Sequence, residues 1–197
     1  MKKAGISLFM ASAMALSMLS GCGSSSTVES VKEKTEEDVV EEYVPNQDYL
    51  DALATFGLDD ISFEYDSLDE ACYAIVGEDN AFIEIMSFGY KNDLAKEMYD
   101  RIYYTVTGYT DDQIASVDSY MKETFASIAS NDWCEMTTDY DADKELYILQ
   151  LHYTGLDDKD HVSTMVDEGV LGLTEDANQI SISATDEAAQ DNGLIKR

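Results

Sequence analysis

The stretch from Thr110 to Asn131 constrains the fold more than any other part of the sequence. Thr110, followed three residues later by Gln113, is the pattern of a capping box, which satisfies free backbone groups at the start of a helix. Apolar residues then repeat at spacings of three and four, at Ile114, Val117, Met121, Phe125 and Ile128. This spacing places them on one face of a helix. A helix with a single apolar stripe needs a second layer to pack on, and we expect that layer to be a sheet.

Strands for this sheet are predicted on both sides of the helix, where short segments alternate apolar and polar residues or are rich in Tyr, Ile and Val. We expect strands at residues 61–65, 71–76, 81–90, 94–106, 133–139, 145–153 and 180–184. Residues 94–106 could also form a helix, but their Tyr, Thr and Val content favours a strand. Further helices are predicted at 48–56, 159–168 and 185–192. This order predicts an α+β two-layer sandwich with a mostly antiparallel sheet and amphipathic helices on one face.

The first twenty-two residues have the pattern of an export signal. Lys2 and Lys3 precede an apolar run from Ile6 to Met18, which is too short for the roughly twenty residues that cross a membrane. The run ends in Leu-Ser-Gly-Cys at residues 19–22. This order is similar to the signals of bacterial lipoproteins, which implies cleavage before Cys22 and a diacylglyceryl group on its sulfur. An ordinary secretory signal with a chance cysteine is the alternative reading.

We therefore divide the chain into a signal peptide at residues 1–21, an acidic flexible tether at 22–47 and a single α+β domain at 48–197. The tether is Ser-rich and then Glu-rich, with too little apolar surface to offset the entropy of ordering. Two acyl chains on Cys22 would hold the domain at the extracytoplasmic face of the cell membrane.

The charge of the chain excludes one class of partner. Residues 22–197 contain 41 Asp and Glu against 10 Lys and Arg, a formal charge of −31. Such a surface repels phosphate backbones, so we expect no nucleic-acid binding. A small molecule, a peptide or an envelope protein is left open as a partner, as is the oligomeric state. The charge is also what keeps a crowded surface protein soluble.

Two cysteines remain once Cys22 is lipidated. Cys72 and Cys134 both lie in predicted strands, and in an oxidising compartment they could form a disulfide. Two separate buried thiols are the alternative, because free Cys is among the most buried residue types.

One acidic run resembles the start of a calcium loop. Residues 139–143 read Asp-Tyr-Asp-Ala-Asp, but the sixth position is Lys144 where the loop needs glycine, and the twelfth is Gln150 where it needs glutamate. A solvated hairpin turn is therefore favoured. The run at 157–161 is better explained as the start of a helix, where acidic residues are stabilised by the helix dipole.

Other residues with functional chemistry are few. His152 is expected to be exposed on the strand face opposite Leu149 and Leu151, and neither it nor His161 has the neighbours of a catalytic triad or zinc site. No cofactor motif is present, so no cofactor is expected. Aromatic rings on an exposed sheet face could stack sugars or peptides. The candidates, about half of which must be core, are Tyr73, Tyr90, Tyr99, Tyr103, Tyr104 and Tyr147.

Several segments occur in an order that matches a known family. They are the turn Gly-Tyr-Lys-Asn-Asp at 89–93, the Thr-capped helix after Gly108-Tyr109, Leu-His-Tyr-Thr-Gly-Leu-Asp at 151–157, and the closing segment 180–196. With the lipoprotein signal, this order resembles the YehR-like small bacterial lipoproteins over about residues 61–196. The resemblance implies a compact α+β lipoprotein domain with no catalytic residues to transfer. The acidic composition departs from the Lys-rich character of many such proteins.

Together these patterns predict a membrane-anchored extracytoplasmic lipoprotein that acts as a non-enzymatic binding or accessory module. Two alternatives remain open: a hydrolase that uses two of the many carboxylates, and a surface protein that binds calcium weakly.

Overall fold

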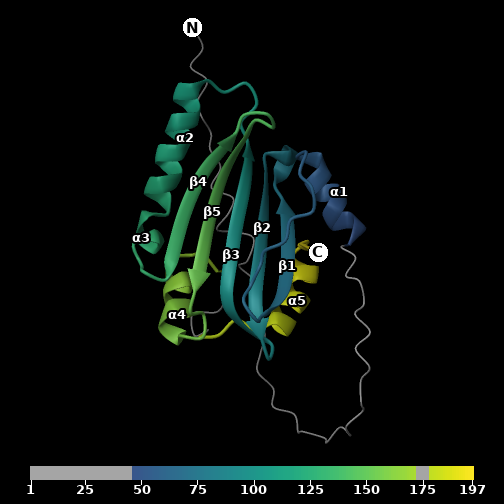
Figure 1. Ribbon diagram of the computed structural model, residues 1–197, viewed down its shortest axis with the longest axis vertical. Helices are drawn as coiled ribbons and strands as arrows, with labels where there is room; N and C mark the ends of the chain where they lie inside the picture. The colour runs from purple at the N-terminus through teal and green to yellow at the C-terminus, as the bar shows by residue number, and fades with distance from the viewer. Residues whose placement is uncertain (1–45, 172–177) are drawn as a thin grey trace, which may run out of the picture.

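The computed structural model describes residues 46–171 and 178–197, which form an α+β fold around one antiparallel sheet (Figure 1). The strand order is β4-β5-β3-β2-β1-β6. The strands are β1 (Asp69–Val76), β2 (Phe82–Lys91), β3 (Leu94–Thr105), β4 (Cys134–Asp141), β5 (Leu146–Thr154) and β6 (Ile195–Lys196). The helices are α1 (Gln47–Thr55), α2 (Asp111–Thr124), α3 (Ala126–Ala129), α4 (Lys159–Asp167) and α5 (Ile182–Asp191), with a short 3-10 turn, η1, at Glu78–Asn80. The predicted fold class is confirmed.

Helices α2 to α5 pack on one face of the sheet, as the two-layer prediction requires. Val117 and Met121 of α2 contact the row of Ile102 and Leu149. Residues of α4 and α5 pack with Tyr153 and its neighbours on the same side. Because these side chains alternate along β3 and β5, the apolar face of the sheet is fully buried under the helices.

The opposite face carries α1 and the chain that follows it. Tyr49, Leu53 and Phe56 of α1 pack against β1 and β2. The predicted layering therefore has an exception, since α1 lies across the sheet from the other helices. Figure 1 shows the chain between α1 and β1 running in front of β2 on this side.

The strongest local signals are confirmed. Thr110 and Gln113 form a complete capping box at the start of α2. Residues 94–105 form a strand rather than a helix, and the predicted hairpins are β1–β2, β2–β3 and β4–β5. Asn92 and Asp93 make the second turn with positive φ angles of 53° and 65°, which these residue types tolerate.

Two predicted strands are wrong. Residues 61–65 form no ladder, because Phe63 and Tyr65 lie flat on the sheet instead: the Tyr65 hydroxyl donates to the Ser87 carbonyl oxygen at 2.7 Å. Of residues 180–184 only Ser181 makes a bridge, to Leu94, and the helix α5 starts at Ile182. Residues 182–184, predicted as part of a strand, thus form the first turn of helix α5.

A distant carboxylate explains the second of these corrections. Asp93, in the β2–β3 turn, accepts hydrogen bonds from the hydroxyls of Ser181 and Ser183 at 2.8 and 2.9 Å and from the Ser183 backbone N–H at 2.8 Å. These hydrogen bonds lower the pKa of Asp93 although desolvation opposes them. The start of α5 is therefore stabilised by a residue that no local pattern reveals.

Cys72 and Cys134 are separate buried thiols, in accord with the second of the two predicted alternatives and not with a disulfide. Cys72 packs beneath α1, whereas Cys134 packs in the core on the helix-covered face. Burial raises the pKa of Cys72 to about 12 and that of Cys134 to about 11. Both thiols are thus protonated and unreactive at neutral pH.

We expect the unreduced Cys22→Ser variant to take up two alkyl groups when it is denatured. The native protein should react far more slowly, because both thiols are buried and protonated. Intact mass measurement after alkylation counts the labels. A denatured, unreduced sample that takes up none would show that the two cysteines are bridged.

The predicted signal peptide at residues 1–21, Cys22 and most of the tether at 22–47 lie outside the described residues. Within residues 46–171 and 178–197, no helix is both long and apolar enough to cross a membrane.

Candidate functional site

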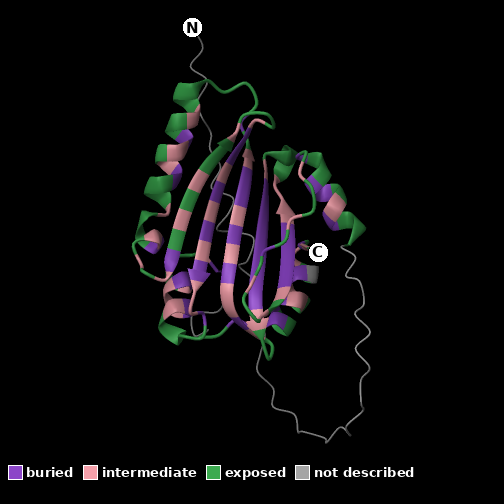
Figure 2. Ribbon diagram, viewed as in Figure 1, coloured by how far each residue is buried: buried purple, intermediate pink, exposed green. Residues whose placement is uncertain are grey.

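On one face, half of the sheet is covered by no helix of residues 46–171 and 178–197. Along β5, Leu149, Leu151 and Tyr153 are fully buried, but the residues between them are only half-buried. Figure 2 shows this alternation on β3 and β5, and exposed residues along β4. No helix crosses in front of these three strands in Figure 1. We call this surface, the side of β3, β5 and β4 that carries Arg101, Gln150 and Thr137, the open face.

A hollow of about 470 Å³ lies on the open face. Strand register brings its residues together in two rows: Arg101 pairs with Gln150 and Gln150 with Thr137, while in the next row Ile148 stands between Tyr103 and Asp139. Its lining is Arg101, Tyr103, Thr137, Thr138, Asp139, Ile148 and Gln150. Volumes of about 300–1,000 Å³ are typical of small-molecule sites. The hollow thus has the size of a ligand site, with a cation at one end and an acid at the other.

Arg101 is held in a fixed position at one end of the hollow. Its Nε and one terminal nitrogen both donate to the side-chain oxygen of Gln150, and its other terminal nitrogen donates to the Tyr103 hydroxyl at 3.3 Å. The guanidinium also lies 4.6 Å from the centre of the Phe63 ring. Neighbours on three sides therefore orient it, which lowers the entropy lost when it binds a ligand.

A row of stacked rings borders the hollow. Tyr99 stacks on Phe63 with ring centres 4.8 Å apart, and on its other side stacks on His152 at 4.0 Å. The Nε2 atom of His152 lies 3.3 Å from Glu97. His152 is on the face opposite Leu149 and Leu151, as predicted, but it is half-buried and not exposed, because this ring stack covers it.

The six candidate tyrosines do not form an exposed aromatic surface. Tyr73, Tyr103 and Tyr147 are buried, and Tyr90, Tyr99 and Tyr104 are half-buried. The prediction of an exposed aromatic sheet face is therefore wrong for these residues. Four of them pack under the helices, and Tyr99 and Tyr103 pack with α1 and the chain that follows it. In the described part of the chain, the exposed tyrosines are instead Tyr109 and Tyr140, at 38% and 37% exposure.

The acidic run at 139–143 covers the end of β4 and the start of the β4–β5 turn, so it belongs to the hairpin predicted in preference to a calcium loop. One carboxylate oxygen of Asp141 accepts from the backbone N–H groups of Asp143 and Lys144, each at 3.0 Å, and the other lies 2.8 Å from the Lys144 ammonium. In the part of the chain that the structure describes, no group of three or more acids, cysteines or histidines is arranged to hold a metal ion.

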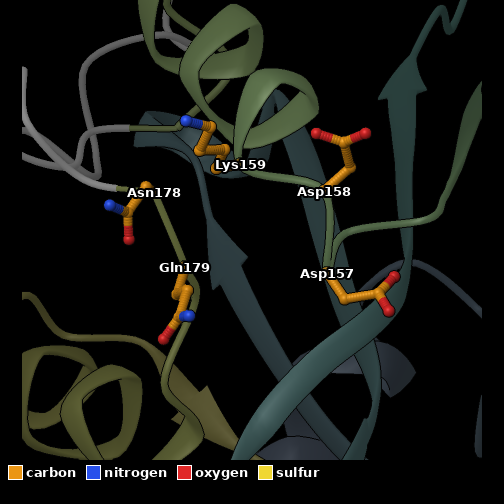
Figure 3. A pocket seen from close by; sticks show the side chains of 5 residues that line it. All are labelled: Asp157, Asp158, Lys159, Asn178 and Gln179. Atoms are coloured by element: carbon orange, nitrogen blue, oxygen red, sulfur yellow. The ribbon is translucent and has the colours of Figure 1, made fainter.

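A second hollow lies at the start of α4 (Figure 3). Asp158 caps the helix by accepting from the Asp160 N–H at 2.9 Å, and Asp157 lies 3.6 Å from Lys96. Figure 3 shows both carboxylates directed away from Asn178 and Gln179 across the hollow. Asp158 therefore serves the helix start, as predicted, whereas Asp157 pairs with Lys96, and the two carboxylates do not converge on the hollow. The ring of His161 also packs within the protein, because it stacks on Trp133 with ring centres 4.6 Å apart.

Two acids are buried beneath the helices in the core. Glu84 on β2 and Asp100 on β3 are 4% and 6% exposed and are hydrogen-bonded to each other. Burial raises the pKa of both groups, and the charge of Asp100 raises that of Glu84 further. Within the described residues, neither Asp100 Oδ1 nor the hydroxyl of Tyr153 has a hydrogen-bond partner. The pair is protonated more readily than ordinary carboxyls, and it lines none of the hollows described above.

Comparisons with known proteins give a weak likeness of fold. No family model matches the chain, and no curated protein matches it. An NMR structure of a protein from Streptococcus pneumoniae TIGR4 is 11% identical, with a TM-score of 0.43, and the match covers 85% of this chain and all of that one. The NMR structure of the YehR protein of E. coli is 11% identical, with a TM-score of 0.46, over 66% of this chain and 93% of that one.

Sequence reasoning missed Arg101 and the buried acids. Arg101 is one of two arginines in the chain and alternates with Tyr99 and Tyr103 along one strand, which was the available signal. Glu84 alternates in the same way with Met86 and the other apolar residues of its strand face. Among 41 acidic residues, however, no local pattern distinguishes a buried carboxylate from a solvated one.

Proposed function

We propose that the protein is a membrane-anchored extracytoplasmic lipoprotein whose domain binds a ligand on the open face and catalyses no reaction. The observation that supports the binding role is the hollow on that face, where Arg101 is held in place by neutral partners. The pattern of residues 1–22 supports the anchoring role. The close carboxylate pair, Glu84 and Asp100, gives no support to a hydrolase, since it lies in the core away from this hollow. Membership of the YehR-like family stays a prediction on which none of this rests.

We expect Cys22→Ser to abolish lipid attachment. Cells grown in labelled palmitate should label the unchanged protein, which should sediment with membranes. The variant should carry no label, because without the sulfur the thioether to the diacylglyceryl group cannot form. Cys134→Ala is the matched control, since it removes another cysteine and leaves Cys22 in place.

Two results would contradict the anchoring role. One is an unlabelled wild-type protein in the soluble fraction with residues 1–21 still attached. The other is a label that persists in Cys22→Ser, which would place the lipid elsewhere. The binding role is tested separately, by titrating the protein with the dialysable small molecules of an envelope extract and following the arginine side-chain signals by NMR.

A further inference from the structure

The two arginines of the chain have contrasting surroundings. Arg197 lies 2.8 Å from Asp60 and 3.0 Å from Glu70, so its charge is balanced. Arg101 has no carboxylate within 4.0 Å among residues 46–171 and 178–197, although acids outnumber bases 41 to 12 in the sequence. Its charge is balanced by no acid of the described chain, even though it is half-buried. A half-buried guanidinium without an acidic partner binds a carboxylate favourably.

The hydrogen bonds of Arg101 leave room for that carboxylate. Its five N–H groups include one on Nε and two on each terminal nitrogen. Three of the five point at Gln150 and Tyr103. Within the described part of the chain, the other two N–H groups, one on each terminal nitrogen, have no partner. A carboxylate can accept from one N–H group on each terminal nitrogen in a bidentate contact.

The other end of the hollow carries the opposite charge. Asp139 lies on β4, two strands from Arg101 on β3, and its row in the sheet is two residues further along the strands. Sheet geometry places the two Cα atoms about 12 Å apart. One oxygen of Asp139 accepts from the Tyr140 N–H at 2.8 Å. Its exposed carboxylate therefore faces the same hollow from the opposite end and would attract an ammonium group.

The charge of the whole chain selects among carboxylate ligands. A formal charge of −29 repels an anion, whereas a zwitterion has no net charge to repel. Resting on the proposed binding function, we propose that the hollow binds a zwitterionic amino acid or short peptide. Arg101 takes its carboxylate and Asp139 its ammonium group.

The two arginines make a direct test practical, because the arginine Nε spectrum of the full chain holds two signals. Arg101→Lys identifies the first of them, and the Arg197 signal is an internal control. Alanine, alanylalanine and trialanine are titrated in turn. We expect at least one to shift the Arg101 signal saturably. The N-acetylated and the amidated form of that compound should each bind at least about tenfold more weakly, because each lacks one charge.

Three variants separate the contacts, and their binding is measured by calorimetric titration because Arg101→Gln lacks the Arg101 signal. Arg101→Gln should remove the preference for the free carboxylate, and Asp139→Asn the preference for the free ammonium group. Lys91→Gln, at the exposed end of β2 beside the β2–β3 turn, removes the same charge as Arg101→Gln away from the hollow and should leave binding unchanged.

The ligand class is overturned if none of the three zwitterions shifts the Arg101 signal, or if either blocked form binds as tightly as its parent. If the zwitterions fail and the envelope extract still shifts that signal, the binding function stands and only the ligand class falls. If neither shifts it, both fall.

Discussion

The double variant Glu84→Gln, Asp100→Asn is expected to melt at a higher temperature than the unchanged protein at neutral and alkaline pH. Both acids are buried, and above the ordinary carboxyl pKa they must either hold a proton or bury a charge, which costs free energy. Neutral amides do not ionise and avoid this cost. We expect a gain of about 2 kcal/mol in the free energy of unfolding at about pH 8. Thermal unfolding of the two proteins across a range of pH measures it.

The sign follows from the direction of the two pKa shifts. Because both pKa values are raised in the folded protein, the folded state binds more protons than the unfolded state above the ordinary carboxyl range. The contribution of the pair is therefore fully present below about pH 4 and is lost as the pH rises through neutrality. The pKa values of Asp60 and Asp118 are lowered, chiefly by hydrogen bonds from Arg197 and Lys122, so their contribution is lost only in more acidic solution.

A matched control is Glu64→Gln with Asp69→Asn, which removes two charges from exposed positions. This control should keep the pH dependence of the unchanged protein. If the core double variant also keeps that dependence, or is less stable at alkaline pH, the buried pair is not the source of the effect.

Gly89→Ala is expected to destabilise the fold by about 1–3 kcal/mol, through overpacking. A Cβ atom at this position would lie 2.3 Å from the ring of Tyr65. The ring cannot move aside freely, because its hydroxyl donates to the carbonyl oxygen and the hydroxyl of Ser87 at 2.7 and 3.0 Å. Urea unfolding of the variant measures the loss.

A double-mutant cycle isolates this contact. In a Tyr65→Ala background the ring is absent, so adding Gly89→Ala should cost much less than it does alone. An equal cost in both backgrounds would contradict the contact. The need for glycine would then come instead from the register shift between Gly89 and Tyr90 in the β2–β3 ladder.

Local patterns predicted those elements whose stabilising contacts are local. The cap of α2 and the turn at Asn92 and Asp93 need only neighbouring residues, and both were predictable. The segment at 61–65 has the alternation of a strand, yet its backbone pairs with no strand of the sheet. Its Phe63 ring stacks on Tyr99 of β3 instead. The start of α5 likewise depends on Asp93, far away in sequence. These contacts are tertiary, so periodicity could not reveal them.

The candidate site shows the same division. The alternation in β5 predicted which side of the strand faces the core, and Leu149 and Leu151 lie there. The hollow on the other side depends on where α1 and the chain after it stop covering the sheet, which no pattern in β3 or β5 encodes. Arg101 became a candidate only when the three strands were aligned in register.

The position of β4 at the end of the sheet has a consequence for how copies of the protein meet. An outer strand offers unpaired backbone groups on which another copy could add a strand. Here the edge strand β4 carries the exposed acids Glu135 and Asp139. Pairing the edge strands of two copies would place like charges opposite one another, and this repulsion opposes fibre-like growth wherever many copies are crowded together.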